Sequence, residues 1–179
     1  CGINFSDVDF LAINSSNKAH RKEKFLYMVK SCPRPGLVID KLRSRRKRKN
    51  ILDELAIIPG FDTAGVKCIP VEHHTAHLAS AYYPSEFESA AVLSIDGFGD
   101  FSSSAWGIGE NGRLDVKEYV HFPDSLGVFY QAITQFIGFP AYGDEYKIMG
   151  LAPYGSVSCL PELEKVLVIN GDGRYSLTL

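Results

Sequence analysis

Three of the five histidines in the chain lie within five residues, in the run His73-His74-Thr75-Ala76-His77. Helical residues four apart share one face, with their Cβ atoms about 5–6 Å apart, so His73 and His77 could bind one metal ion. Two imidazoles do not complete a metal site, and we expect a carboxylate from another element. Asp96 is the leading candidate, because it is predicted to end an apolar strand and to begin a glycine-rich turn.

Two histidines and a carboxylate with an open position suit iron(II) or another divalent cation. The alternative is that these histidines are ordinary core or surface residues held by hydrogen bonds. His74 projects about 100° away from His73 around the helix, so we expect it to support the ligands or to contact substrate rather than to bind the metal.

A glycine-rich turn with serines follows the expected strand, and it contains Gly97, Gly99, Ser102 and Ser103. Glycines let the backbone approach a phosphate, successive N–H groups can form an anion-binding concavity, and serine hydroxyls add donors. Actin-like ATPases hold nucleotide phosphates on a strand-turn-strand of this kind. The alternative is a tight hairpin with solvated serines, since the run lacks the GxxxxGK[ST] pattern of a Walker loop.

Residues 143–155 form a third candidate, in which Lys147 could reach a phosphate or a carboxylate. Asp144 or Glu145 could cap the start of a helix. Composition alone favours a structural helix over a ligand site here.

The elements that must position these residues alternate between strands and helices, which predicts an α/β fold. Apolar patterns predict strands at 9–14, 67–71, 90–95, 101–108, 114–122 and 175–179, and helices at 19–30, 74–82 and 126–137. Asn111-Gly112 is a strong hairpin signal, and Asp124-Ser125 can cap the helix that starts at Leu126.

A basic run at 41–49 precedes an apolar helical stripe from Ile51 to Ile58. The run could bind anions or nucleic acid, but a solvated face of an insertion-like helical region is the interpretation that we prefer. We therefore expect two parts, a helical insertion-like region at 1–65 and a core with the metal and nucleotide sites at 66–179.

Composition excludes several classes of protein. The net charge of -2 does not indicate a nucleic-acid binder, and no apolar stretch approaches the roughly 20 residues of a membrane-spanning helix. The four cysteines form no CxxC pair, which predicts a reducing cytoplasm rather than a disulfide framework. The chain begins without methionine and ends inside a strand-like segment, so we expect a fragment of a larger domain.

Taken together, three stretches resemble signature segments of the NodU/CmcH-type O-carbamoyltransferases. They are Glu72 to Ser85, Ala91 to Gly97, and Gly143 to Gly155. Their order and spacing both fit, and the resemblance extends from about Cys68 to Gly155.

The resemblance implies an N-terminal domain of the actin-like ATPase (ribonuclease H-like) type, with a mixed β-sheet and flanking helices, followed by a YrdC-like domain that this chain lacks and that would be its natural partner. It implies that ATP and carbamoyl phosphate give a carbamoyl-adenylate, whose carbamoyl group passes to a small-molecule hydroxyl acceptor. The residues that match the family's metal ligands are His73, His77 and Asp96, and the metal is usually iron. A further carboxylate ligand lies later in the family's chain. His74 is a candidate for the base that accepts the hydroxyl proton.

Two alternatives remain open. One is a relative of HypF or of the tRNA threonylcarbamoyl-adenosine enzyme, which would carbamoylate a thiol or a tRNA base, although the segment from Gly143 to Lys147 argues against it. The other is a non-catalytic interaction module with the same fold. This stretch alone is not expected to complete the reaction.

Overall fold

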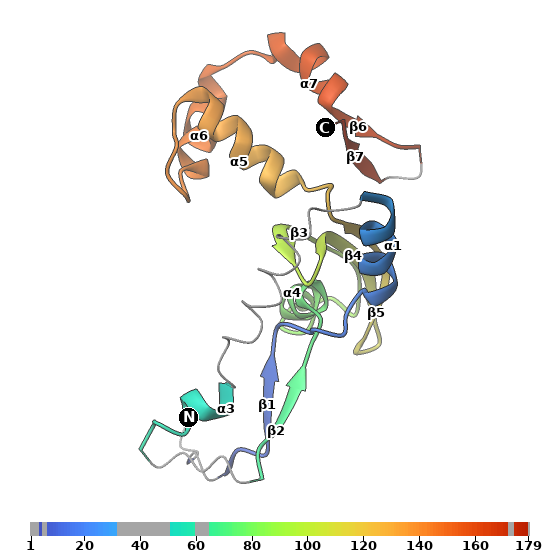
Figure 1. The fold of residues 1–179 in the computed structure, drawn as a ribbon, viewed down its shortest axis with the longest axis vertical. Coiled ribbons are helices and arrows are strands. Elements are labelled where there is room, and N and C mark those ends of the chain that lie inside the picture. The colour runs from blue at the N-terminus through green and yellow to red at the C-terminus, as the bar shows by residue number, and fades with distance from the viewer. Residues whose placement is uncertain (1–3, 5–6, 32–50, 60–64, 172–173, 179) are drawn as a thin grey trace. The chain divides into compact units, whose positions relative to one another are not determined.

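The computed structural model describes residues 4, 7–31, 51–59, 65–171 and 174–178 (Figure 1). The chain divides into two compact units, Cys1–Val71 and Glu72–Leu179. The first unit contains β1 (Phe10–Ile13), α1 (Arg21–Ser31), α3 (Ile51–Leu55) and β2 (Lys67–Pro70). The predicted basic helical face at 41–49 lies outside the described residues.

In the first unit, β1 and β2 pair in parallel, with Phe10 opposite Lys67 and Ile13 opposite Pro70. The predicted strands at 9–14 and 67–71 and the predicted helix at 19–30 are therefore confirmed. The predicted helical region at 1–65 included the strand at 9–14, which pairs with β2, and the predicted division of the chain at residues 65 and 66 stays a prediction.

The second unit contains the remaining elements: α4 (His73–Tyr82), β3 (Ser89–Gly99), β4 (Ser102–Glu110), β5 (Arg113–His121), α5 (Leu126–Ile137), α6 (Glu145–Leu151), two 3₁₀ turns (Ala152–Tyr154 and Val157–Cys159), α7 (Leu160–Val166), β6 (Leu167–Ile169) and β7 (Tyr175–Leu177). The strands β3, β4 and β5 form an antiparallel sheet in that order, and β6 pairs with β7 separately. The mixture of helices and strands confirms the predicted α/β class. Among the described residues there are three separate sheets rather than the single mixed sheet that we expected, and the actin-like type of fold stays a prediction.

The hairpin between β4 and β5 forms where the sequence predicted it. Asn111 and Gly112 have φ angles of 51° and 71°, and the pairing continues up to Glu110 opposite Arg113. Positive φ at both central residues is typical of a type I′ turn, whose twist matches that of the flanking strands.

The core of the second unit lies between α4 and the sheet. Leu78 and Tyr82 of α4 are buried against Val92 of β3 and Ala105 of β4. A Cβ at Gly109 would lie 2.3 Å from the Tyr82 ring, so the absence of a side chain there lets the helix approach the sheet. The packing of α4 on the sheet, which includes Val92 of β3, fixes the distance between α4 and β3, the two elements that contain the predicted metal ligands.

The helix α5 has the predicted bounds, and Ser125 caps it by accepting the Val128 N–H. Its apolar stripe is less buried than the pattern predicted, because Phe136 is 88% exposed and only Thr134 is buried among the helix residues. No helix in the described ranges is long and apolar enough to cross a membrane.

Candidate metal centre

The helix α4 starts one residue earlier than predicted and includes both candidate histidines. Its N-cap is Glu72, whose carboxylate accepts hydrogen bonds from His74 N at 3.1 Å and from Thr75 N at 2.7 Å. A capping carboxylate satisfies N–H groups that have no partner within the helix and interacts favourably with the helix dipole. The helical geometry then places His73 and His77 on one face, with their ring centroids 4.6 Å apart.

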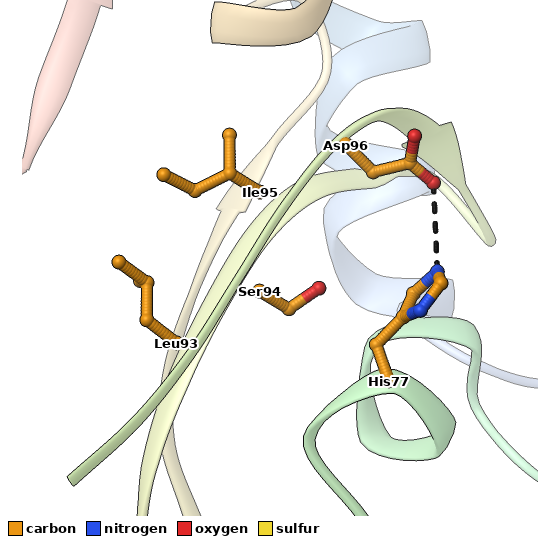
Figure 2. A pocket seen from close by; sticks show the side chains of 5 residues that line it. All are labelled: His77, Leu93, Ser94, Ile95 and Asp96. Carbon is orange, nitrogen blue, oxygen red and sulfur yellow. Dashed lines mark ion pairs between the residues drawn. The ribbon is translucent and has the colours of Figure 1, made fainter. Parts of the chain in front are cut away.

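Asp96 lies on β3, opposite these two imidazoles. Successive side chains of a strand point to opposite faces, and Figure 2 shows Ser94 and Asp96 on the side of His77 while Leu93 and Ile95 point away from it. The prediction that Asp96 ends its strand is wrong, because β3 continues to Gly99, which pairs with Ser102. The pairing register shifts between Ile95 and Gly99, so Asp96 begins an irregular stretch within the strand.

The backbone around Asp96 is held by the start of α5. Ser125 donates its hydroxyl to the Gly97 carbonyl at 2.6 Å. A Cβ at Gly127 would lie 2.6 Å from the Asp96 carbonyl oxygen, so the first turn of α5 packs directly on this part of β3. The irregular stretch is therefore fixed by a second element and is not an unsupported loop.

Three side-chain atoms from α4 and β3 converge. His73 Nε2 lies 3.0 Å from Asp96 Oδ2 and 3.0 Å from His77 Nε2, and His77 Nε2 lies 3.6 Å from Asp96 Oδ2. Two atoms that bind one ion at about 2.1 Å are about 3.0 Å apart at a right angle and about 3.4–3.6 Å apart at wider angles. All three separations therefore fit ligands of one cation.

Hydrogen bonds among His73, His77 and Asp96 explain these distances less well than a shared cation does. One ring nitrogen offers either a single proton or a single lone pair, yet His73 Nε2 has two polar atoms at 3.0 Å. It can make a well-aligned hydrogen bond to only one of them. A shared divalent cation would satisfy all three atoms at once, and two imidazoles with one carboxylate are a suitable set for iron(II).

The electrostatics favour the form of Asp96 that can bind a metal. Partial burial by itself raises the pKa of the Asp96 carboxyl, but hydrogen bonds with His73 and with the Gly97 N–H outweigh burial, so the pKa lies below its ordinary value. The Gly97 N–H donates to Oδ1 at 2.6 Å, which leaves Oδ2 directed at the histidines. The carboxylate is thus ionised and oriented.

A cavity of about 330 Å³ adjoins the ligands and is lined by His77, Leu93, Ser94, Ile95 and Asp96 (Figure 2). It provides room beside the exposed His77, whose side chain is 47% accessible. A metal bound here would therefore keep positions open for a further ligand.

The position of His74 opposes two of its predicted roles, contact with substrate and acceptance of a proton, and fits the third, support of the ligands. Its side chain is completely buried, and its Nδ1 lies 2.9 Å from the Ser94 hydroxyl oxygen. Burial lowers the pKa of His74, although a backbone interaction with Ser102 opposes this effect. Because a buried imidazole cannot touch an acceptor, the structure favours a supporting role, in which His74 joins α4 to β3.

The serines of the predicted phosphate-binding turn are also inside the fold. Ser102 and Ser103 are completely buried. Ser102 Oγ lies 3.0 Å from His121 Nδ1, and Ser103 donates to the Asp124 carbonyl at 2.5 Å. These hydroxyls are not solvated, because they bond to a neighbouring strand and to the segment before α5.

The two glycines of the turn are in different surroundings. A Cβ at Gly97 would meet no atom within 4 Å, whereas one at Gly99 would lie 2.0 Å from His73 Cδ2. Gly99 therefore makes room for a candidate metal ligand, which is a role that the sequence did not indicate. The Gly97 N–H donates to Asp96, and phosphate binding by the backbone of these two glycines stays a prediction.

Lys147 lies on α6, where its Nζ forms an ion pair with Asp144 Oδ1 at 2.6 Å and lies 5.5 Å from the centroid of the Phe139 ring. The hydrogen bond with Asp144 raises the pKa of Lys147. The structure therefore gives this lysine a local partner, and its proposed contact with a phosphate stays a prediction.

Sequence reasoning missed Ser94 and Asp100. Ser94 precedes Asp96 by two residues, so the alternation along a strand could have placed it on the same face. Asp100 accepts the His73 N–H at 3.1 Å, and no sequence signal indicated that contact.

Comparisons with known proteins agree with the resemblance that the sequence motifs indicated. The profile of the family described as Carbamoyltransferase N-terminus matches residues 2–178. The chain is 41% identical over 109 residues to the uncharacterized protein sll1178 of Synechocystis sp., with 60% of the chain and 18% of that protein aligned. It is 45% identical over 112 residues to the nodulation protein NolNO of Sinorhizobium fredii, with 61% and 16% aligned.

A third relative is the nodulation protein NolO of Bradyrhizobium diazoefficiens, which is 42% identical over 95 residues, with 52% of the chain and 17% of that protein aligned. The chain thus spans less than a fifth of the length of these relatives.

Proposed function

Because the chain belongs to the family of the carbamoyltransferase N-terminus, we propose that it forms the metal-binding part of an ATP-dependent O-carbamoyltransferase. Family membership confirms the resemblance that the motifs indicated. The observation that supports the metal-binding role is the convergence of His73, His77 and Asp96, whose ligand atoms all lie within 4.8 Å of one another.

The proposed reaction first forms carbamoyl-adenylate, in a hydrolysis followed by an adenylation that together make up the first step, and then transfers the carbamoyl group. Carbamoyl phosphate and water give carbamate and phosphate, and the carbamate oxygen then attacks the α-phosphorus of ATP, which releases pyrophosphate and forms carbamoyl-adenylate. In the second step, the oxygen of an acceptor hydroxyl attacks the carbamoyl carbon, the C–O bond to AMP breaks, and the hydroxyl proton passes to a base. Adenylation supplies a good leaving group, which an ordinary carbamate lacks.

A divalent cation, for which we propose iron(II), would offset negative charge on phosphate groups and help to position the reactants. The part of this chain is to hold that cation, through the imidazoles of His73 and His77 and the ionised carboxylate of Asp96. The exposed edge of His77 and the adjoining cavity are where a phosphate-bearing group could approach. We propose that a phosphate approaches the backbone of the glycine-containing stretch at residues 97–99, rather than the buried serine hydroxyls.

An exchange assay tests the first step without knowledge of the acceptor. Adenylation is reversible, so the intact protein with iron(II) should incorporate labelled pyrophosphate into ATP only when carbamoyl phosphate is present. Asp96→Asn should reduce this exchange at least about 100-fold, because a neutral amide is a poor ligand for a divalent cation. The matched control is Asp115→Asn, which changes an exposed carboxylate on β5 that pairs only with Lys117 among the partners seen for it.

Three results would contradict the proposal. Exchange that does not need carbamoyl phosphate would exclude carbamate as the adenylated group. Equal exchange in Asp96→Asn and Asp115→Asn would exclude a role of the Asp96 carboxylate in adenylation. The third result is an unmodified protein that binds no iron, zinc or nucleotide, as expected of a non-catalytic module. Metal analysis of the unmodified protein beside a His73→Ala/His77→Ala variant would reveal the lack of metal directly.

A further inference from the structure

The carboxylate of Asp100 contacts the helix that contains two of the proposed metal ligands. Its Oδ2 accepts the backbone N–H of His73 at 3.1 Å, across 27 residues of sequence. The first N–H groups of a helix have no partner within the helix, so an acceptor from elsewhere can fix the start of α4. This contact differs from those of Glu72, which accepts the N–H groups of His74 and Thr75.

The stretch from Asp96 to Asp100, at the end of β3 and the start of the turn to β4, therefore restrains His73 in three ways. Asp100 holds its backbone N–H, Gly99 leaves space for its ring, and Asp96 lies 3.0 Å from its Nε2. If only the ring of a histidine were held, movement of its backbone could still displace the ring nitrogen. Here the backbone and the imidazole of His73 are both fixed by one short stretch of chain.

The backbone of this turn is itself unusual. Asp100 and Phe101 have backbone φ angles of 50° and 90°. Residues other than glycine rarely adopt such positive values. Such conformations persist where the surroundings fix them, and they concentrate at functional sites. A helix cap alone does not require them, because Glu72 already caps α4.

We propose that Asp100 is a positioning residue of the metal centre, which orients His73 by holding its backbone N–H. The proposal rests on the proposed function in that it takes His73, His77 and Asp96 as the ligands. Asp100 does not bind the cation in this proposal. Its effect is to keep the His73 nitrogen where the other two ligands can share an ion with it.

Substitutions at Asp100 can separate the hydrogen bond from the backbone conformation. Asp100→Gly keeps access to positive φ but removes the acceptor. Asp100→Asn keeps an acceptor oxygen and a residue type that tolerates positive φ. Glu72→Ala is the matched control, because it removes a carboxylate from the same helix start without removing the acceptor for His73 N–H.

Cobalt(II) alone is the probe, added to the intact metal-free protein and followed by its visible absorption, which reports on ligand geometry. Loss of a supporting contact of a metal ligand typically weakens binding about 10–100-fold. We expect Asp100→Gly to weaken cobalt binding at least about 10-fold and to alter the absorption spectrum, while Asp100→Asn stays within about 3-fold. Glu72→Ala should lower thermal stability and leave the spectrum unchanged.

A second readout does not need the metal. In the metal-free protein, the His73 amide should exchange its hydrogen faster in Asp100→Gly than in the unmodified protein and in Asp100→Asn. Hydrogen exchange followed by mass spectrometry with electron-transfer fragmentation can resolve this amide.

The outcomes separate the two proposals. If the unmodified protein binds no cobalt, the metal centre itself is refuted. If it binds cobalt and Asp100→Gly binds equally tightly with the same spectrum, the positioning role is refuted while the metal centre stands. If cobalt affinity falls equally in Asp100→Gly and Glu72→Ala, Asp100 acts only through helix stability, and the proposal is likewise refuted.

Discussion

Gly97 and Gly99, near the end of β3, should respond very differently to replacement by alanine. A Cβ at Gly99 would lie 2.0 Å from His73 Cδ2, 2.1 Å from Cγ and 2.6 Å from Nε2. A Cβ at Gly97 would meet no atom within 4 Å. The two substitutions add the same methyl group, two residues apart, so the unmodified protein and the Gly97→Ala variant are both controls for Gly99→Ala.

The expected size of the effect follows from contact distances. Carbon atoms in favourable contact are about 3.5–4.0 Å apart, so the His73 ring must move by about 1.5–2 Å in Gly99→Ala. Metal–ligand distances are tolerated within about 0.2 Å. The contact involves Cγ as well as the ring tip, so a small adjustment at the end of the side chain cannot relieve it, and His73 should be lost as a ligand.

We expect Gly99→Ala to weaken metal binding by at least about 100-fold, which is about 2.8 kcal/mol. Crowding should also lower the free energy of unfolding by about 1–3 kcal/mol. Gly97→Ala should change metal affinity by less than about 3-fold, because alanine preserves the N–H that Asp96 accepts.

Titration with cobalt(II) and urea unfolding of the metal-free protein measure the two quantities on the same samples. Similar metal affinities for Gly99→Ala and Gly97→Ala, with both variants folded, would show that the observed position of His73 is not required for binding. A comparable loss in both variants would mean that any added side chain disturbs the turn, and the argument from the His73 contact would fail.

Three further predictions concern the core, the metal and an ion pair. Leu78→Ala should lower the free energy of unfolding by about 2–5 kcal/mol, measured with urea, because the Leu78 side chain is completely buried. A metal at about 100 times its dissociation constant should stabilise the fold by about 2.7 kcal/mol, so a chelator should lower the melting temperature of the unmodified protein but not that of Asp96→Asn. Asp144→Asn should lower the pKa of Lys147 towards its ordinary value, because the hydrogen bond with Asp144 raises it; an NMR titration would then show the lysine losing its proton at lower pH.

Local patterns predicted most of the secondary structure. The helix from Leu126 to Ile137 has the predicted bounds, because Ser125 provides a capping hydroxyl immediately before an apolar repeat. Asn111-Gly112 predicted its hairpin because few other residue pairs adopt positive φ at both positions. In each case, residues within a few positions of one another determine the conformation.

The environment of the site could not be predicted in the same way. Ser103 lies 3.1 Å from the Tyr175 hydroxyl, 72 residues away in the sequence, and no local pattern reveals such a partner. His74 was expected either to support the ligands or to contact substrate, and the sequence could not decide between these roles, since helical spacing gives the direction of a side chain but not what covers it. Phe136 was expected to be buried and is exposed. An apolar stripe on a helix does not indicate whether another element lies against it.

The proposed ligands were found because their geometry is mostly local. The turn of a helix relates His73 to His77, and a strand that follows that helix brings Asp96 to the same side of the sheet. The role of Gly99 was missed, since the sequence suggested phosphate binding and only coordinates reveal the neighbouring ring. The binding of iron(II) by His73, His77 and Asp96 stays a prediction.

The short sequence separation within the ligand set has a consequence for biosynthesis. His73 and Asp96 are only 23 residues apart, and closing a loop of that length costs little more entropy than closing a shorter one, at about 0.6 kcal/mol for each doubling. A ribosome that adds about 5–20 residues per second completes this interval within a few seconds. Once β3 has emerged and paired, the nascent polypeptide holds every proposed ligand of this chain, so the ion could be acquired during translation.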